Sequence, residues 1–217
     1  MKINTHELWS GADKSSVTYT TYLVEETPDI KNHNPRPAVI ICGGGGFFKV
    51  TDRDKEPAAL YFLNKGFQAI TLDYTVGKDS SYPAPLYDLA KMLLVTREKA
   101  QQWNIDPDKI IFIGFSAGAT HCASLANRWN ESILQDYFNY PKEKILKIAI
   151  CGDNSSAPQG EITTPCGNCR QALLEYECTQ DSPIVVLCAS TQGNILEIGS
   201  IKDLLPFCFE LLYKETD

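Results

Sequence analysis

The sequence contains no apolar run of about 20 residues, the length that a helix needs to cross a bilayer. The stretch from Met1 to Glu7 also lacks the apolar core of a secretory signal peptide. Positive charge is scarce, because 20 lysines and arginines stand against 27 acidic residues and leave a net charge of -7. Nucleic acid and anionic membranes attract basic proteins, so neither is expected as a partner. These absences predict a cytoplasmic protein that acts on a small molecule.

The eight cysteines are not expected to form disulfide bonds, because thiols stay reduced in the cytoplasm. Six lie in or beside apolar runs, where a free cysteine behaves as a small hydrophobic residue. The other two, Cys166 and Cys169, form a Cys-x-x-Cys pair and require a separate interpretation.

Residues 110–118 read Ile-Ile-Phe-Ile-Gly-Phe-Ser-Ala-Gly, an apolar run that ends in the G-x-S-x-G pattern. In a nucleophile elbow, the serine lies at a strained turn between a strand and a helix, and small residues on both sides let the backbone close. The following helix directs its N-terminal amides toward the reacting oxygen. Helix-compatible residues such as Ala119, Ala123 and Leu125 come next. We therefore expect a buried strand and an elbow at Ser116; an ordinary strand-to-helix connection is the alternative.

Four glycines, Gly43 to Gly46, follow the short apolar run from Pro37 to Cys42, which is typical of a buried parallel strand. A phosphate-binding loop would need Gly-Lys-Ser/Thr, or G-x-G-x-x-G opening into a helix, and neither is present. Glycines can instead bring bare N–H groups close to a developing alkoxide. We interpret this stretch as an oxyanion loop, with a flexible turn as the alternative.

Strand and helix patterns alternate around these motifs. An edge strand is expected at residues 17–24 and a buried strand at 67–74. A helix is expected at 55–65, and one long helix after Pro83 and Pro85 should reach Trp103 before Asp106-Pro107-Asp108 turns the chain. This alternation predicts the α/β class, with a mainly parallel sheet and helices on both faces.

These motifs, together with Asp52-Arg53 and Tyr82-Pro83-Ala84-Pro85, resemble those of an α/β-hydrolase of the acetyl-esterase and carbohydrate-esterase branch. The resemblance is carried by residues 35–135 and assigns residues 1–143 to a truncated hydrolase-like portion. It implies that Ser116 is the nucleophile that attacks small acyl esters, in a reaction that needs no cofactor. It also implies an oxyanion hole built from the amides of Ala117 and of Gly44 or Gly45.

Histidine is scarce, and only His6, His33 and His121 are present. In the family that these motifs resemble, the acid and then the histidine follow the serine along the chain, yet no histidine follows residue 121. His121 should point into the packing of its helix or away from the hydroxyl. Asp153 follows a strand but has no histidine to orient. We therefore expect an impaired esterase, or one that obtains its base in an unusual way.

The segment from residue 144 to residue 217 has a different character. Strands are expected at 145–151, 184–187 and about 195–197, and Pro165-Cys166-Gly167-Asn168-Cys169 should open a helix. Two thiolates at a helix N-terminus are spaced to share a tetrahedral zinc ion, whereas a redox Cys-x-x-Cys would follow a thioredoxin-like unit. The segment resembles the C-terminal half of a cytidine deaminase. The resemblance implies zinc ligation by Cys166 and Cys169, and base stacking by Phe209, for which a core position is the alternative.

A zinc deaminase also needs a third ligand and a glutamate that shuttles the proton. The nearest string, His121-Cys122-Ala123-Ser124, has serine in place of the glutamate and belongs to the helix after the elbow. The set of zinc ligands and catalytic residues that a deaminase needs is thus also incomplete.

Three hypotheses remain. The chain is an esterase of small acyl esters with reduced activity, an incomplete zinc-dependent nucleoside deaminase, or a catalytically inactive hybrid scaffold. It is expected to have two portions, residues 1–143 and 144–217, in one α/β arrangement or in a half-domain that forms a homo-oligomer. The first hypothesis is favoured, because the motifs for the hydrolase fold are the more complete.

Overall fold

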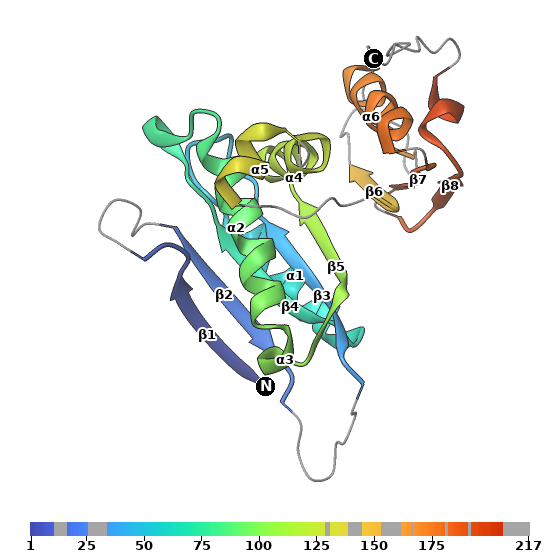
Figure 1. The fold of residues 1–217 in the computed structure, drawn as a ribbon. Coiled ribbons are helices and arrows are strands. Elements are labelled where there is room, and N and C mark those ends of the chain that lie inside the picture. The colour runs from blue at the N-terminus through green and yellow to red at the C-terminus, as the bar shows by residue number, and fades with distance from the viewer. Residues whose placement is uncertain are drawn as a thin grey trace. The chain divides into compact units, whose positions relative to one another are not determined.

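The computed structural model describes residues 1–10, 17–25, 34–128, 131–138, 145–152, 162–165, 167–180, 182–190 and 192–205. The chain divides into two compact units, residues 1–140 and 141–217, each with its own sheet (Figure 1).

The first unit contains a five-stranded sheet in the order β1-β2-β4-β3-β5. Strands β4, β3 and β5 are parallel, whereas β1 pairs antiparallel with β2 and β2 pairs antiparallel with β4. The expectation of a mainly parallel sheet is therefore wrong, because the first two strands add an antiparallel pair to the β4 edge. The strands are β1 (Lys2–Glu7), β2 (Thr18–Leu23), β3 (Arg36–Cys42), β4 (Gln68–Asp73) and β5 (Ile105–Gly114).

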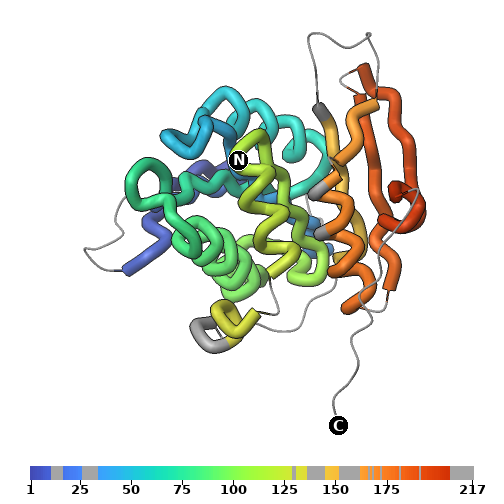
Figure 2. Tube along the Cα trace, turned by 90° about the horizontal axis from the view of Figure 1, so that it is seen from above, coloured from blue at the N-terminus to red at the C-terminus, as the bar shows by residue number. Residues whose placement is uncertain are grey.

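Helices pack on both faces of this sheet, as predicted (Figures 1 and 2). On β3, Val39 and Ile41 belong to the cluster beneath α1, whereas Ile40 belongs to the larger cluster on the opposite face. This alternation follows from the two-residue period of a strand, and it explains why the β3 run is apolar throughout. The helical segments are α1 (Asp52–Asn64), the 3-10 turn η2 (Gly77–Asp79), α2 (Ala84–Glu98), α3 (Ala100–Trp103), α4 (Ala117–Arg128) and α5 (Ser132–Phe138).

Three local expectations for this unit are wrong. Strand β2 is not an edge strand, because β1 pairs along its outer side. The helix after Pro83 divides at Lys99 into α2 and α3, although the apolar positions through Trp103 are buried as expected. The Asp106–Asp108 stretch lies within β5, next to a shift of register, and does not form a separate turn.

The apolar run before the serine is less buried than expected. Ile110, Phe112 and Ile113 are half-buried, and Ile111 retains 45% of its exposure. The physical reason is that β5 is the outermost strand of the five-stranded sheet, with β3 on one side only. Burial of an apolar strand depends on its place in the sheet, which the run itself does not reveal.

The second unit contains a three-stranded sheet in the order β6-β7-β8, in which β6 and β7 are parallel and β8 is antiparallel to β7. Its elements are β6 (Lys147–Gly152), α6 (Gly167–Gln180), β7 (Val185–Ser190), β8 (Ile195–Ile198) and the 3-10 turn η3 (Ile201–Leu204). On α6, the buried Glu177 accepts hydrogen bonds from the amides of Ile184 and Ile201 at 2.7 and 3.0 Å. This carboxylate therefore ties the helix to the chain on either side of β7 and β8.

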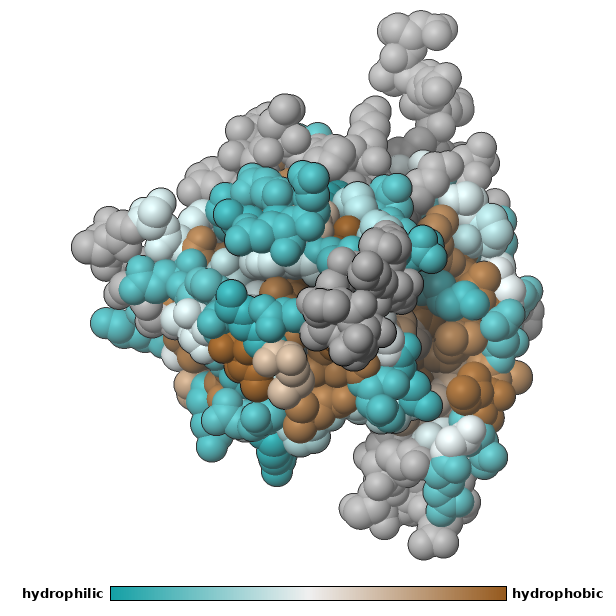
Figure 3. All heavy atoms as spheres, turned by 90° about the horizontal axis from the view of Figure 1, so that it is seen from below, coloured by the Kyte–Doolittle hydropathy of each residue, from teal (hydrophilic) through white to brown (hydrophobic). Residues whose placement is uncertain are grey.

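Several large apolar side chains stay exposed, among them Phe48, Leu60, Tyr61 and Ile111. On the face drawn in Figure 3, apolar surface occurs in areas separated by hydrophilic side chains. Among the residues described, no helix is both long enough and apolar enough to cross a bilayer.

Candidate active site

Ser116 lies in the short connection between the end of β5 at Gly114 and the start of α4 at Ala117. Its φ angle is +49°, in the left-handed region that side chains other than glycine rarely adopt. Such a conformation costs about 1–3 kcal/mol and is held by the surrounding structure. Ser116 is exposed, and its hydroxyl has no hydrogen-bond partner among the described residues. The turn thus presents an unengaged hydroxyl at a helix N-terminus.

The two glycines of the motif have no room for a side chain. A Cβ atom on Gly114 would lie 2.4 Å from the Ala119 Cα, and one on Gly118 would lie 2.2 Å from the Cys42 carbonyl oxygen. The same carbonyl accepts a hydrogen bond from the Phe115 amide at 3.0 Å. The start of α4 therefore packs directly on the last residue of β3, which brings the serine to the loop that follows β3.

That loop contains the four glycines and meets the serine at Gly44. A Cβ atom on Gly44 would lie 3.0 Å from the Phe115 carbonyl oxygen and 3.1 Å from the Ser116 Cβ. Gly45 has a φ of +141°, and a side chain there would overlap the Lys49 carbonyl. Gly45 therefore requires glycine, whereas Gly44 leaves only a tight space for a side chain.

The backbone amides expected to bind an oxyanion differ in whether they already donate a hydrogen bond. The Gly44 N–H donates a hydrogen bond to Asp54 Oδ2 at 3.2 Å. The amides of Gly45 and Ala117 have no acceptor within the part of the chain that is described. Gly44 is therefore already engaged, and Gly45 and Ala117 carry the N–H groups that remain available for a ligand.

Asp54 and Thr51 form a network with Gly44 that the sequence interpretation missed. The Thr51 hydroxyl lies 2.6 Å from Asp54 Oδ2 and 3.2 Å from the Gly44 carbonyl, so its single proton goes to the nearer carboxylate. The Thr51 amide donates to the Gly44 carbonyl at 2.9 Å. A signal was present, because Thr-x-x-Asp at the start of α1 is close to the Thr-x-x-Glu pattern that marks helix N-termini.

An ion pair lies beneath the glycine loop. The buried Lys55 ammonium contacts Asp73 at the end of β4 and lies 3.1 Å from Asp52. Burial lowers the pKa of Lys55, but the pairs with Asp73 and Asp52 outweigh burial and leave the pKa above its ordinary value. The lysine stem also packs against Gly43, whose Cβ would lie 3.0 Å from its Cγ. This ion pair supports the base of the loop.

His121 lies on α4 and packs among aromatic side chains. Its ring makes edge contacts with Phe47 and Tyr74 at centroid distances of 5.4 and 4.8 Å. Its Nε2 is buried and has no hydrogen-bond partner among the described residues. Burial lowers the pKa of His121, and the charge of Asp88 opposes this shift only in part. His121 is thus packed among aromatic rings and makes no hydrogen bond to Ser116.

The remaining candidate bases and acids are not brought to the serine by the described residues. His6 is exposed on β1 and contacts the Tyr19 ring at 5.2 Å. His33, Asp153 and Phe209 lie outside the described residues. The predicted stacking by Phe209 and the absence of a triad histidine therefore stay predictions.

Of the Cys-x-x-Cys pair, Cys169 lies in the first turn of α6, whereas Cys166 is outside the described residues. Cys169 is exposed, and the neighbouring Arg170 donates to the carbonyls of Pro165 and Leu204 at 2.7 and 2.9 Å. Over the described ranges, no three His, Cys, Asp or Glu side chains come together as metal ligands. A tetrahedral zinc site needs more ligands than this pair supplies, so no zinc-dependent step follows from these residues.

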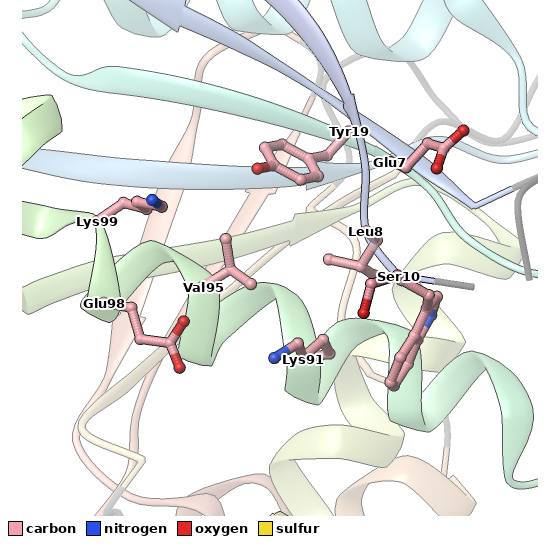
Figure 4. A pocket seen from close by; sticks show the side chains of 9 residues that line it. Glu7, Leu8, Ser10, Tyr19, Lys91, Val95, Glu98 and Lys99 are labelled. Atoms are coloured by element: carbon pink, nitrogen blue, oxygen red, sulfur yellow. The ribbon is translucent and has the colours of Figure 1, made fainter.

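A cavity of about 360 Å³ lies elsewhere in the first unit (Figure 4). The end of β1 with the residues that follow it, Tyr19 of β2, and α2 with Lys99 line the cavity. Its charged side chains include Glu7, Lys91 and Glu98, and Tyr19 is more buried. None of the predicted site residues is among its lining residues, so this cavity is separate from the serine and its loop.

Comparison with curated proteins relates this chain to esterases and to a xylan-degrading enzyme. It is 34% identical over 99 residues to endo-1,4-beta-xylanase B of Butyrivibrio fibrisolvens, a match that covers 44% of this chain and 16% of the xylanase. It is 28% identical over 115 residues to the esterase LipQ of Mycobacterium tuberculosis, covering 51% of this chain and 27% of LipQ. The chain thus spans less than a third of the length of these relatives.

Solved structures support the same fold. MGS-M1, an α/β hydrolase from a Medee basin deep-sea metagenome library, aligns with a TM-score of 0.63 at 26% identity over 86% of this chain and 80% of its own. The carboxylesterase Cest-2923 of Lactobacillus plantarum aligns with a TM-score of 0.60 at 25% identity over 70% of this chain and 56% of its own. The BD-FAE family model matches residues 27–159, which include β3, the glycine loop, β5 and the serine turn. Because this match covers more than half of the sequence, the chain belongs to the BD-FAE family, on an α/β-hydrolase fold.

Proposed function

We propose that this chain is a serine hydrolase that cleaves small acyl esters, including acetyl esters of carbohydrates, with Ser116 as its nucleophile. The observation that carries this proposal is the exposed, unengaged Ser116 hydroxyl at positive φ, at the N-terminus of α4. The names of the xylanase and of the esterase LipQ lend support. So does the name of versiconal hemiacetal acetate esterase of Dothistroma septosporum, to which the chain is 30% identical over 96 residues.

The reaction uses the serine oxygen and the two available amides. Ser116 Oγ attacks the ester carbonyl carbon, and its proton passes to a base. The carbonyl oxygen takes up the negative charge, which the N–H groups of Gly45 and Ala117 stabilise together with the N-terminus of α4. The alcohol then leaves with a proton, and water hydrolyses the acyl-serine to release the acid and restore the hydroxyl.

The activity is expected to be low, because no histidine follows residue 121 and His121 is packed against Phe47 and Tyr74. Without a positioned base, solvent removes the serine proton, and without a positioned acid the leaving group departs unassisted. Two kinetic signatures follow. Activated esters such as p-nitrophenyl acetate react much faster than alkyl acetates, and kcat/KM rises with pH across the neutral range.

The test is the intact mass of the protein after exposure to a fluorophosphonate, together with p-nitrophenyl acetate turnover. Wild type and Ser124→Ala, a change on the same helix, are expected to gain one adduct and to release nitrophenol. Ser116→Ala is expected to do neither. If wild type gains no adduct, or if Ser116→Ala is labelled equally, the proposal fails.

For residues 144–217 we propose a deaminase-like segment without deaminase activity of its own, which makes the chain a hybrid. The parallel β6/β7 pair, the antiparallel β8 and the Cys-x-x-Cys at the start of α6 favour this origin. The Glu177 carboxylate is engaged by backbone amides and is not available to shuttle protons. We expect no ammonia release from cytidine. Stoichiometric zinc that is lost in Cys169→Ser, together with ammonia release, would contradict this.

A further inference from the structure

We propose that Asp54 is a positioning residue for the ester-cleaving site. Its carboxylate fixes Gly44 in the glycine loop and leaves the oxyanion to the amides of Gly45 and Ala117. This inference rests on the proposed function and assigns a role in it to a residue in the first turn of α1.

The contacts of Asp54 connect the start of α1 to both polar backbone groups of Gly44. Asp54 Oδ2 accepts from the Gly44 amide at 3.2 Å and from the Thr51 hydroxyl at 2.6 Å. The Thr51 amide closes the ring by donating to the Gly44 carbonyl at 2.9 Å. Gly44 is thus held at its N–H and at its C=O by two residues of a single helix N-terminus.

The position of Gly44 makes this clamp relevant to the chemistry. A Cβ atom there would lie 3.1 Å from Asp54 Oδ2 and 3.1 Å from the Ser116 Cβ, so only a glycine separates the carboxylate from the nucleophile. Any shift of Gly44 also moves the amide of Gly45, the next residue in the chain. Since misplacement by 1 Å can cost about 100-fold in rate, the clamp has catalytic consequences.

The geometry favours positioning over proton transfer. Two donors already occupy Asp54 Oδ2, and Oδ1 faces the exposed Arg53 with a separation of 3.5 Å. The negative charge of a carboxylate repels the negative charge that develops on the nearby oxyanion. The useful property of Asp54 is therefore its hydrogen-bond acceptor oxygen, and its charge does not help catalysis. An asparagine at this position supplies such an oxygen without the charge.

The experiment compares Asp54→Ala with Asp54→Asn in p-nitrophenyl acetate turnover. Asp54→Ala removes the acceptor, so kcat is expected to fall about 10- to 100-fold with KM changed by less than about 3-fold, as for a loss of transition-state stabilisation. Asp54→Asn is expected to stay within about 3-fold of wild type, because its oxygen replaces the carboxylate. Glu56→Ala, an exposed acid on the same helix, is the matched control and should change neither constant. If Asn is as damaging as Ala, or if Ala has no effect, the inference is overturned.

A second readout does not depend on activity. In NMR spectra, the Gly44 amide proton is expected to shift upfield in Asp54→Ala and to stay hydrogen-bonded in Asp54→Asn. An unchanged Gly44 amide in Asp54→Ala refutes the clamp, whatever the activity. If the amide responds as expected but wild type neither reacts with a fluorophosphonate nor turns over ester, the clamp is supported and the proposed function, with the catalytic role of Asp54, is refuted.

Discussion

Gly44 and Ser116 are in such close contact that a methyl group on the glycine would stand 3.1 Å from the serine Cβ. The glycine belongs to the loop after β3 and the serine to the turn after β5, and these two strands are parallel neighbours in the sheet. Parallel pairing therefore places two loops that lie 72 positions apart in the sequence at the same edge of the sheet. Substitutions at this contact should therefore reduce the reactivity of Ser116 more than they reduce the stability of the fold.

Gly44→Ala tests the contact directly. The new Cβ would be tight against Phe115 and Ser116, so the loop must give by a few tenths of an ångström. We expect a loss of about 1–2 kcal/mol in the free energy of unfolding. Labelling of Ser116 by a fluorophosphonate is expected to slow at least about 10-fold, because the Gly45 amide moves with the loop. Gly199→Ala, where a side chain meets open space, is the control. Normal labelling of Gly44→Ala would disprove the contact.

Gly118→Ala is expected to damage the fold itself. Its Cβ would overlap the Cys42 carbonyl at 2.2 Å, and neither backbone can move without separating α4 from β3. We expect a loss of about 3 kcal/mol or more. All three tryptophans, Trp9, Trp103 and Trp129, belong to residues 1–140, so tryptophan fluorescence during urea unfolding follows the first unit alone. A midpoint equal to that of Gly199→Ala would be incompatible with this packing.

Lys55→Met is expected to lower the stability of the first unit. The change keeps most of the buried stem but leaves Asp73 without the cation that pairs with it. Because Asp73 remains partly exposed, water compensates in part, and we expect a loss of about 2 kcal/mol in the free energy of unfolding. The exposed Lys78 provides the control substitution, Lys78→Met. Equal urea midpoints for the two variants would show that the ion pair contributes nothing.

His121 is expected to make the first unit less stable in acid. Burial lowers the pKa of His121 in the folded protein below its value in the unfolded chain, which is about 6.5. At a pH between these two pKa values, the unfolded chain therefore binds more protons than the folded protein. Stability is therefore unaffected by this group above the unfolded pKa and is lost as the pH falls toward the folded one. His121→Phe keeps an aromatic ring beside Tyr74 and should flatten the decline between pH 7 and pH 5. Parallel pH profiles for the two proteins would exclude His121 as the cause.

The central part of the fold was predictable because its signals are local. Buried strands such as β3 and β4 read as short apolar runs, and G-x-S-x-G marks the turn at Ser116 with no reference to distant residues. Strand β1 gave no such signal, because its sequence Lys-Ile-Asn-Thr-His-Glu is polar and almost wholly exposed. It is held in the sheet by backbone pairing with β2, and this pairing turned the expected edge strand into an inner one.

The site was only partly predictable for a related reason. The sequence pointed to two candidate glycine amides for the oxyanion but did not separate them, since that depends on which amide a distant side chain engages. Asp54 is ten positions from Gly44, and its hydrogen bond to that glycine depends on how α1 packs after the loop. Side-chain contacts between separate elements follow from tertiary structure, which no local pattern encodes.

Strand β3 lies between β4 and β5, and both of these neighbours follow it in the chain. During synthesis, the segment from Ala38 to Cys42, fully buried in the folded protein, therefore leaves the ribosome before either partner exists. It gains β4 only after residue 73 and β5 only after residue 114. An unpaired apolar strand is prone to aggregation over that interval. A chaperone that recognises extended apolar segments is expected to bind the nascent chain at β3.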